Sequence, residues 1–92
     1  MRIQWDPAKA AASEAAHGVT IVEAATVLAD EMALTRDDPD AIGEQRFAIP
    51  GLSGEGTFLV VIYTYREPDV IRIISAWKAN RRQRVRYEKG RG

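Results

Sequence analysis

The 92-residue sequence predicts an α+β domain, and three stretches of the chain indicate this class. Residues 44–77 contain three runs rich in β-branched and aromatic side chains, separated by short turns, which is typical of an antiparallel meander. Residues 7–29 carry two helix patterns, and residues 80–89 carry a strongly basic third one. We therefore expect an antiparallel sheet of three to four strands, with an N-terminal helical hairpin packed on one face and a C-terminal basic helix.

The first element is a short strand at residues 2–5, where polar and apolar side chains alternate. Asp6 and Pro7 then predict a helix, because a carboxylate can cap free helix N–H groups and proline needs no N–H at the first helical position. Gly18 predicts the end of this helix, since glycine readily adopts the left-handed conformation. The predicted apolar face of this helix consists of Ala8, Ala11, Ala12 and Ala15.

A second helix is predicted to start directly afterwards, because Thr20 and Glu23 have the spacing of a capping box. We expect it to end near Ala29, and Met32–Thr35 is a candidate for an additional short strand. The predicted buried stripe of this helix is Ile21, Ala24, Ala25 and Leu28.

Three strands are predicted in the second half of the chain. The first covers residues 44–51, in which Phe47 and Ile49 alternate with other side chains. The second covers residues 57–65 and is β-branched and aromatic on both faces, which predicts the central strand. The third covers residues 70–77 and is expected to alternate throughout. Its two faces would carry Ile71, Ile73 and Ser75 on one side and Arg72, Ile74 and Ala76 on the other.

The C-terminal segment concentrates positive charge. Seven bases and one acid lie between Trp77 and Gly92, a net charge of about +6, whereas the remaining six bases and twelve acids give about −6. Asn80 and Gln83 predict a capped helix at its start. Val85 is the only aliphatic side chain after the cap, and Tyr87 is expected to point away from the core, so packing would hold this helix weakly.

The composition excludes several classes of protein. The sequence has no cysteine, which excludes disulfides and thiolate metal sites. The longest apolar run, Phe58–Tyr63, is too short to cross a bilayer, and the N-terminus has no apolar stretch typical of a signal peptide. We expect a single domain over residues 1–92, located in the cytoplasm and acting without a membrane, a metal or another cofactor.

Arginine-rich segments suit phosphate, because the planar guanidinium donates two parallel hydrogen bonds to phosphate oxygens. Contact with nucleic acid is therefore the favoured interpretation of the basic segment, in which aromatic residues are interleaved with arginine. Three alternatives remain open. The segment could be neutralised by the acidic residues 30–44, it could be a solvated helix, or it could bind an acidic protein.

Short motifs along nearly the whole chain resemble the BrnT toxin family in order and spacing. The most specific motif is Arg72–Ala76, followed by Lys78 and the Arg-rich segment. The other motifs are Trp5–Lys9, His17–Val19, Glu44–Phe47 and Tyr87 with Glu88. The resemblance implies a RelE-like ribonuclease fold and the toxin of a type II toxin–antitoxin pair, which cuts RNA and blocks translation. It also implies a BrnA-like antitoxin, through which the complex binds operator DNA.

Metal-independent RNA cleavage proceeds by attack of a 2′-OH on the adjacent phosphate, which needs a proton acceptor, a proton donor and cations near phosphorus. Strand-borne arginines have better defined directions than arginines on a fraying helix. The predicted catalytic set is Arg46, Arg72, Lys78 and Tyr87. The candidate general bases are His17, the only histidine, and Glu44. The predicted RNA-binding residues are Trp77, Arg81, Arg82 and Arg84. An ordinary solvent-exposed role is the alternative for each charged residue.

Two positions depart from the family pattern. Ala16 stands where the family often has lysine, and Trp77 stands where it often has arginine. Loss of that arginine indicates an alternative function, namely a catalytically weakened toxin homologue that acts as an antitoxin-binding or nucleic-acid-binding module. Trp77 could instead stack on an RNA base, since such stacking contributes about 1–3 kcal/mol per base. A plain protein-interaction domain is the third possibility.

Overall fold

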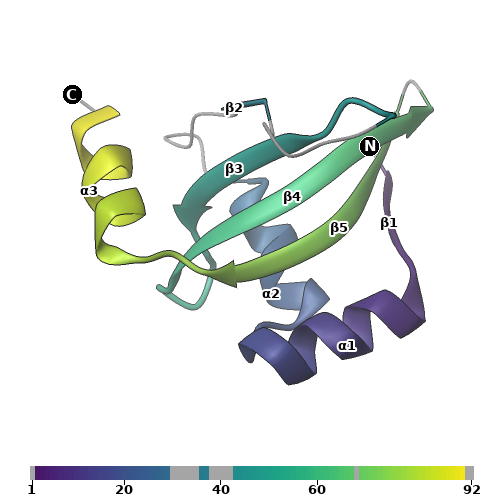
Figure 1. Ribbon diagram of the computed structural model, residues 1–92, viewed down its shortest axis with the longest axis horizontal. Coiled ribbons are helices and arrows are strands. Elements are labelled where there is room, and N and C mark those ends of the chain that lie inside the picture. The colour runs from purple at the N-terminus through teal and green to yellow at the C-terminus, as the bar shows by residue number, and fades with distance from the viewer. Residues whose placement is uncertain (1, 30–35, 38–42, 68, 91–92) are drawn as a thin grey trace.

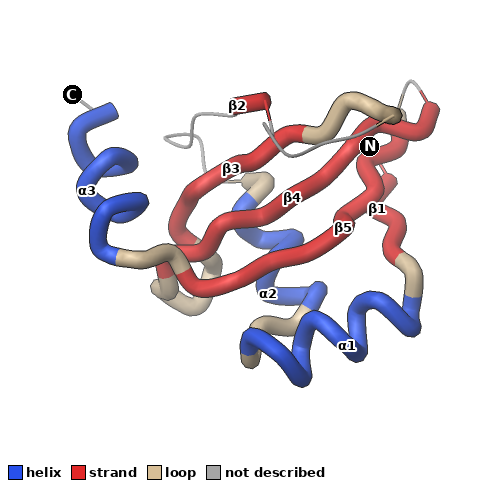
Figure 2. The backbone as a smooth tube through the Cα atoms, in the orientation of Figure 1, coloured by secondary structure: helices blue, strands red, loops and turns tan. Residues whose placement is uncertain are grey.

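The computed structural model describes residues 2–29, 36–37, 43–67 and 69–90 of the chain. Strands and helices follow one another in the predicted α+β order (Figure 1). Figure 2 shows the longer strands crossing the middle of the molecule, with β1 and α3 at opposite ends. The elements are β1 (Arg2–Trp5), α1 (Pro7–His17), α2 (Ile21–Val27), β2 (Arg36–Asp37), β3 (Phe47–Leu52), β4 (Phe58–Glu67), β5 (Val70–Lys78) and α3 (Arg81–Gly90).

The sheet is mixed, in contrast to the antiparallel sheet predicted from the sequence. Its described strands number five, in the order β1-β5-β4-β3-β2. Strand β1 runs parallel to β5, with Arg2 opposite Val70 and Trp5 opposite Ile73, whereas all other pairs are antiparallel. The prediction was wrong on this point because it rested on consecutive strands, and β1 pairs with a strand at the other end of the sequence. The predicted strand Met32–Thr35 lies outside the described residues, and the two-residue β2 follows it.

Strand β4 is central, as its composition predicted. It pairs with β3 on one side and β5 on the other. Side chains on both of its faces are buried, with Leu59 and Val61 on one face and Val60 and Ile62 on the other. A strand that is apolar on both faces can be covered only when other elements lie above and below it.

A β-bulge in β5 shifts the predicted pattern of faces. Ile62 lies opposite Ser75 but Tyr63 lies opposite Ile73, so Ile74 is an extra residue in β5. The predicted alternation is therefore wrong beyond Ile74. Ser75 shares the face of Arg72, and Ala76 lies on the face of Ile73. The bulge also brings Trp77 to the Arg72 face, since Trp77 lies opposite Val60.

Helix α2 covers one face of the sheet, which we call the helix face. Both predicted caps of this region are present, because the Thr20 hydroxyl accepts a hydrogen bond from the Glu23 N–H at 3.1 Å and Gly18 is left-handed with φ of 70°. The helix packs against β3, β4 and β5 (Figure 1). The core that it shares with the sheet includes Val19, Ile21, Ala24, Val27, Leu59, Val61, Tyr63 and Ile73.

Helix α1 lies along β5 with a different face from the one predicted. Asp6 caps its N-terminus, accepting hydrogen bonds from the Ala8 and Lys9 N–H groups at 2.9 and 3.4 Å. No residue of the helix is fully buried, and Ala10 and Ser13 are its half-buried positions. The four alanines predicted to be buried are exposed. The prediction failed because alanine occurs on several sides of the helix, so the sequence gives no periodic signal for the buried face. The four exposed alanines are Ala8, Ala11, Ala12 and Ala15.

Helix α3 begins at the predicted capping box, in which Asn80 and Gln83 exchange backbone-to-side-chain hydrogen bonds of 2.9 and 2.8 Å. Its packing differs from the prediction. Tyr87 is only 6% exposed and its ring meets Phe58 edge-on, with centroids 5.3 Å apart. Val85 is 40% exposed. The helix is therefore anchored by its aromatic residue and not by its aliphatic one.

The β3–β4 hairpin is tied to α2 by polar contacts. Buried Ser53 donates a hydrogen bond to Glu23 Oε2 at 2.8 Å, and its hydroxyl accepts one from the Thr57 N–H at 3.1 Å. Thr26 Oγ1 accepts a bond from the Gly54 N–H at 2.7 Å. Within the described residues, no helix has the length and apolar character needed to cross a membrane.

Candidate functional site

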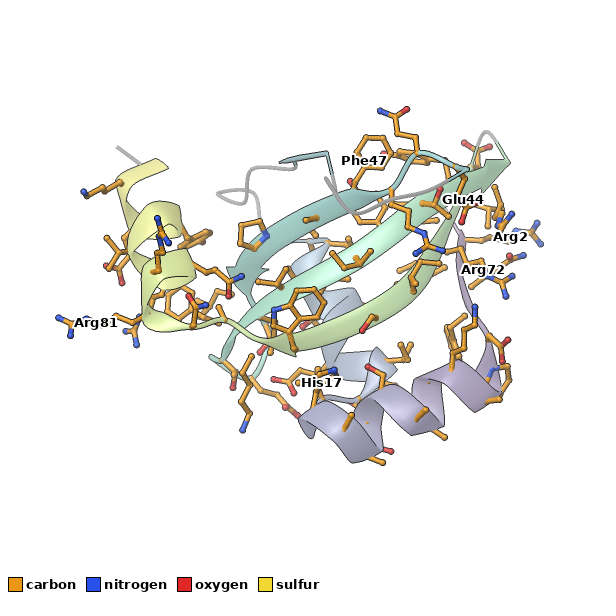
Figure 3. The ribbon with its side chains drawn as sticks, in the orientation of Figure 1. Arg2, His17, Glu44, Phe47, Arg72 and Arg81 are labelled. Atoms are coloured by element: carbon orange, nitrogen blue, oxygen red, sulfur yellow. The ribbon has the colours of Figure 1, made fainter. Side chains whose placement is uncertain are left out.

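Three arginines and one glutamate lie at the end of the sheet where β1 lies. We call Glu44, Arg46, Arg66 and Arg72 the arginine corner. Arg72 on β5 lies opposite Thr64 on β4, so the two side chains share one face of the sheet. The buried Thr64 hydroxyl donates a 2.7 Å hydrogen bond to the Gln45 carbonyl. This bond holds the segment 44–46 beside β4, and Figure 3 shows Glu44 and Arg72 at the same end of the sheet, with Arg2 beside them.

Two of these arginines contact the glutamate directly. Arg46 Nε lies 3.4 Å from Glu44 Oε1, and Arg66 Nη1 lies 3.5 Å from Glu44 Oε2. Arg72 takes part in none of the ion pairs found in the described part of the chain. Among the described residues, the corner therefore has a net positive charge and one guanidinium without a carboxylate partner. Such a group can bind a phosphate without first breaking an ion pair.

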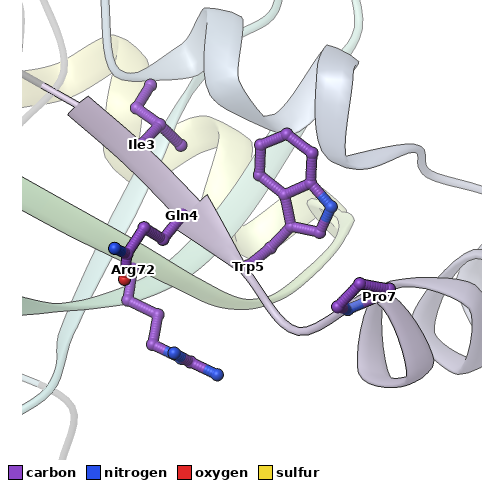
Figure 4. Close-up of a pocket in the computed structure, with 5 residues that line it drawn as sticks. All are labelled: Ile3, Gln4, Trp5, Pro7 and Arg72. Carbon is purple, nitrogen blue, oxygen red and sulfur yellow. The ribbon is translucent and has the colours of Figure 1, made fainter.

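Arg72 also borders a pocket of about 500 Å³ at the outer edge of β1 (Figure 4). The pocket is lined by Ile3, Gln4, Trp5, Pro7 and Arg72. Gln4 lies opposite Arg72 in the sheet, whereas Trp5 lies opposite Ile73 and points to the helix face. Trp5 is 43% exposed. A guanidinium, an amide and an exposed indole around one open pocket are groups that can bind a nucleotide.

A second aromatic group lies where β5 is not paired with β1. The rings of His17, at the end of α1, and Trp77, on β5, have centroids 6.2 Å apart and planes tilted by 51°. Ser13 Oγ donates a long hydrogen bond of 3.4 Å to the Ala76 carbonyl and holds α1 beside this part of β5. His17 is exposed and Trp77 is half-buried. The fold thus joins two candidate residues that are sixty positions apart in the sequence.

The predicted RNA-binding arginines of α3 differ in their surroundings. Arg81 and Arg82 are exposed, and Figure 3 shows Arg81 at the end of the molecule opposite Arg72. The guanidinium carbon of Arg84 lies 4.6 Å from the centroid of the Phe58 ring, and its Nε lies 3.3 Å from Glu88 Oε1. Arg84 is therefore already engaged within the chain, whereas Arg81 and Arg82 present their charges to solvent.

Comparison with known proteins identifies the family. Residues 5–83 match the family described as the ribonuclease toxin BrnT of type II toxin–antitoxin systems. The chain belongs to the BrnT family. The match includes the arginine corner and the His17–Trp77 pair, but it begins after Ile3 and Gln4 of the β1 pocket and ends within the first turn of α3. As a type II toxin, a BrnT protein has an antitoxin as its partner.

A solved structure supports the same fold. The crystal structure of the Brucella abortus ribonuclease toxin BrnT aligns with a TM-score of 0.66, at 22% sequence identity. The alignment covers 88% of this chain and 99% of that chain. The α+β architecture with a mixed sheet is therefore one that this BrnT chain shares with a ribonuclease toxin. No curated protein matches the sequence.

The fold brings together only part of the catalytic set that was predicted for this BrnT chain. Arg46, Arg72 and Glu44 meet in the arginine corner. Lys78 lies six positions beyond Arg72 but, because of the bulge, five ladder steps or about 17 Å along β5, opposite Leu59 on the helix face. Tyr87, on α3, packs against Phe58 of β4. These two residues therefore do not share the corner with Arg72, and their catalytic role stays a prediction.

Sequence reasoning missed three residues of the site. Arg66 contacts Glu44, Thr64 fixes the position of Gln45, and Gln4 lines the pocket beside Arg72. Arg66 follows directly after the predicted central strand, and extending that strand by one residue would have included it. The pairing of Gln4 with Arg72 has no local signal, because it depends on a contact between the two ends of the sequence.

Proposed function

We propose that this BrnT-family chain is an endoribonuclease that cleaves RNA without a metal ion and blocks translation. The observation that carries the proposal is the arginine corner, which lies within the matched region 5–83 and leaves Arg72 without a carboxylate partner among the described residues. The finer features follow the family: a RelE-like arrangement of the fold, a cytoplasmic location, a BrnA-like antitoxin and contact with operator DNA only through the antitoxin complex.

In the proposed reaction, the 2′-oxygen forms a bond to the adjacent phosphorus while the bond from phosphorus to the 5′-oxygen breaks. The 2′ proton passes to a base, and the departing 5′-oxygen receives a proton. Negative charge rises on the phosphate oxygens in the transition state, where fixed guanidinium donors are most effective. Arg72 fits this role because β5 fixes its direction, and Arg46 lies across β4 from it, next to Gln45, whose carbonyl is bonded to Thr64.

The proton transfers are assigned to candidates from the sequence. His17 and Glu44 are the candidate general bases, and Tyr87 and Lys78 are candidates for further catalytic contacts. We propose that RNA runs from the arginine corner toward α3, with a base stacked on Trp77 and phosphates near Arg81 and Arg82. This path suits a single strand, which combines stacking with backbone charge contacts.

The test is cleavage of a single-stranded RNA in the presence of a metal chelator. Arg72→Ala is expected to lower the cleavage rate by about 100-fold or more, the effect of removing one preorganised donor to the transition state. Lys9→Ala is the matched control, because Lys9 is an exposed cation on α1 outside the proposed site. Intact RNA with the unsubstituted protein, together with no growth arrest on expression, would refute the proposal.

A further inference from the structure

Within the part of the chain that the structure describes, Glu44 is the only carboxylate paired with an arginine of the corner, and its two oxygens contact two different arginines. Oε1 faces Arg46 at 3.4 Å and Oε2 faces Arg66 at 3.5 Å. The carboxylate therefore bridges the two guanidiniums, much as two oxygens of a phosphate can bridge a pair of arginines. Arg72, beside them across Thr64, has no such carboxylate among the described residues.

We propose that Glu44 is an internal competitor for RNA, which occupies the site of a backbone phosphate between Arg46 and Arg66. When RNA binds, the Glu44 side chain leaves and a phosphate next to the one at Arg72 takes its place. This inference rests on the proposed function, because it names a second phosphate subsite of the same RNA surface. The subsite would set how tightly RNA is held, since binding must first break two ion pairs.

The surroundings allow the Glu44 side chain to move while the backbone stays. The Glu44, Arg46 and Arg66 side chains are 34%, 32% and 45% exposed, so all three can reach water. Residue 44 lies outside the helices and strands of the described chain. The neighbouring Gln45 carbonyl is held by the buried Thr64 hydroxyl, which keeps Arg46 next to β4. A rotation of one side chain is therefore enough to open the subsite.

The size of the effect follows from the competition. Apparent affinity is reduced by the fraction of protein in which the subsite is open. Two partly exposed ion pairs with the strength usual at a protein surface correspond to a closed state favoured by about 2- to 30-fold. Removing the competing carboxylate should tighten RNA binding by about the same factor.

The test measures binding of a fluorescent single-stranded RNA that carries 2′-O-methyl groups, which cannot be cleaved through the 2′-oxygen. Glu44→Gln is expected to lower Kd about 2- to 30-fold at low salt. Glu14→Gln is the matched control, since it removes one exposed negative charge on α1 outside the described ion pairs. Its effect should be clearly smaller. Circular dichroism melting of each variant verifies that it is folded.

The same substitution in an Arg46→Gln/Arg66→Gln background tests the mechanism. If Glu44 acts through the arginine pair, Glu44→Gln should have no effect on Kd there. An equal gain in that background would overturn the proposal, because it would show a general charge effect. Arg66→Gln alone should weaken binding and reduce the salt slope of log K by about 0.7, the loss of one phosphate contact.

The outcomes also separate this inference from the proposed reaction. An unchanged or raised Kd for Glu44→Gln overturns the competitor role, and a simultaneous loss of cleavage of ordinary RNA would then assign Glu44 to proton transfer. RNA binding with the expected gain but no cleavage by the parent protein supports the subsite and refutes the proposed reaction. Absence of RNA binding by the parent protein overturns both.

Discussion

Replacing Tyr87 with alanine should unfold α3 and leave the rest of the fold in place. Tyr87 is the buried anchor of the helix, with 6% of its surface exposed and its ring edge-on to Phe58. Arg84, also on α3, contacts the same Phe58 ring, with its guanidinium carbon 4.6 Å from the ring centroid. The other described α3 residues are exposed or half-buried, so Tyr87 provides most of the apolar attachment.

The expected magnitude follows from these contacts. Truncating a buried aromatic side chain to alanine costs about 3–5 kcal/mol. The edge-on aromatic pair accounts for roughly 0.5–1.5 kcal/mol of this. The capping box at Asn80 and Gln83 contributes only about 1 kcal/mol to helix stability. A helix of 10 residues is marginal in water without tertiary packing. The free energy lost with the Tyr87 side chain therefore exceeds the stabilisation of α3 by its remaining contacts.

Amide hydrogen exchange measures the result directly. In Tyr87→Ala, the amides of residues 84–90 should exchange almost as fast as those of an unfolded peptide, whereas the β4 and β5 amides should keep their protection. Trypsin should cleave the variant faster after Arg82 and Arg84. Val85→Ala is the control on the same helix, because Val85 is 40% exposed and its loss should change protection little. Full protection of α3 in Tyr87→Ala, or unfolding of the whole chain, would refute the reasoning.

Substitutions at four further positions test the fold. Ser53→Ala removes a buried hydroxyl bonded to the Glu23 carboxylate at 2.8 Å and should lower the unfolding free energy by about 2–3 kcal/mol in urea titration. Ser13→Ala, whose bond is 3.4 Å long, should cost clearly less, and equal losses would contradict this account. Asp6→Ala should cost about 0.5–2 kcal/mol through loss of the α1 cap, and Asp6→Asn should restore most of it. Gly18→Ala forces a side chain into φ of 70° and should lower the unfolding free energy by about 1–2 kcal/mol, measured in the same way.

The parts of the fold that could be predicted depend on neighbours in the sequence. Asp6 and Gly18 bracket α1 through contacts that span four residues or fewer. Thr20 caps α2, and Asn80 pairs with Gln83, at a spacing of three. Each of these signals is complete within one helical turn, so a single sequence contains all the information needed to find it.

The parts that could not be predicted depend on distant contacts. The parallel pairing of β1 with β5 joins residues almost seventy positions apart. The bulge at Ile74 is defined by the register between β4 and β5, and the sequence of β5 alone does not indicate it. The anchoring role of Tyr87 required a partner, Phe58, on another element. Alanine-rich α1 was ambiguous for a further reason, since alanine is tolerated on both buried and exposed faces.

For the candidate site too, features set within one element could be predicted, and contacts between distant elements could not. Arg46 and Arg72 were chosen because strands would fix their directions, which holds for Arg72 on β5, whereas Arg46 lies one residue before β3 and contacts Glu44. Lys78 was included because it follows the Arg72–Ala76 motif, but along the bulged strand it lies about 17 Å from Arg72. Arg66 was missed because its relation to Glu44 appears only when β4 and the segment before β3 lie side by side.

The short pairing of β1 has a consequence for how copies of the protein behave in solution. It covers only residues 70–73 of β5, and the rest of that margin has backbone groups that another strand could bond. Helix α1 lies along this margin, and Ser13 contacts the Ala76 carbonyl there. On the other margin, β2 pairs only with Phe47 and Ala48, and the next strand residues include Pro50, which has no N–H to donate. Both margins thus discourage strand addition, which protects a chain rich in β-branched residues from aggregation.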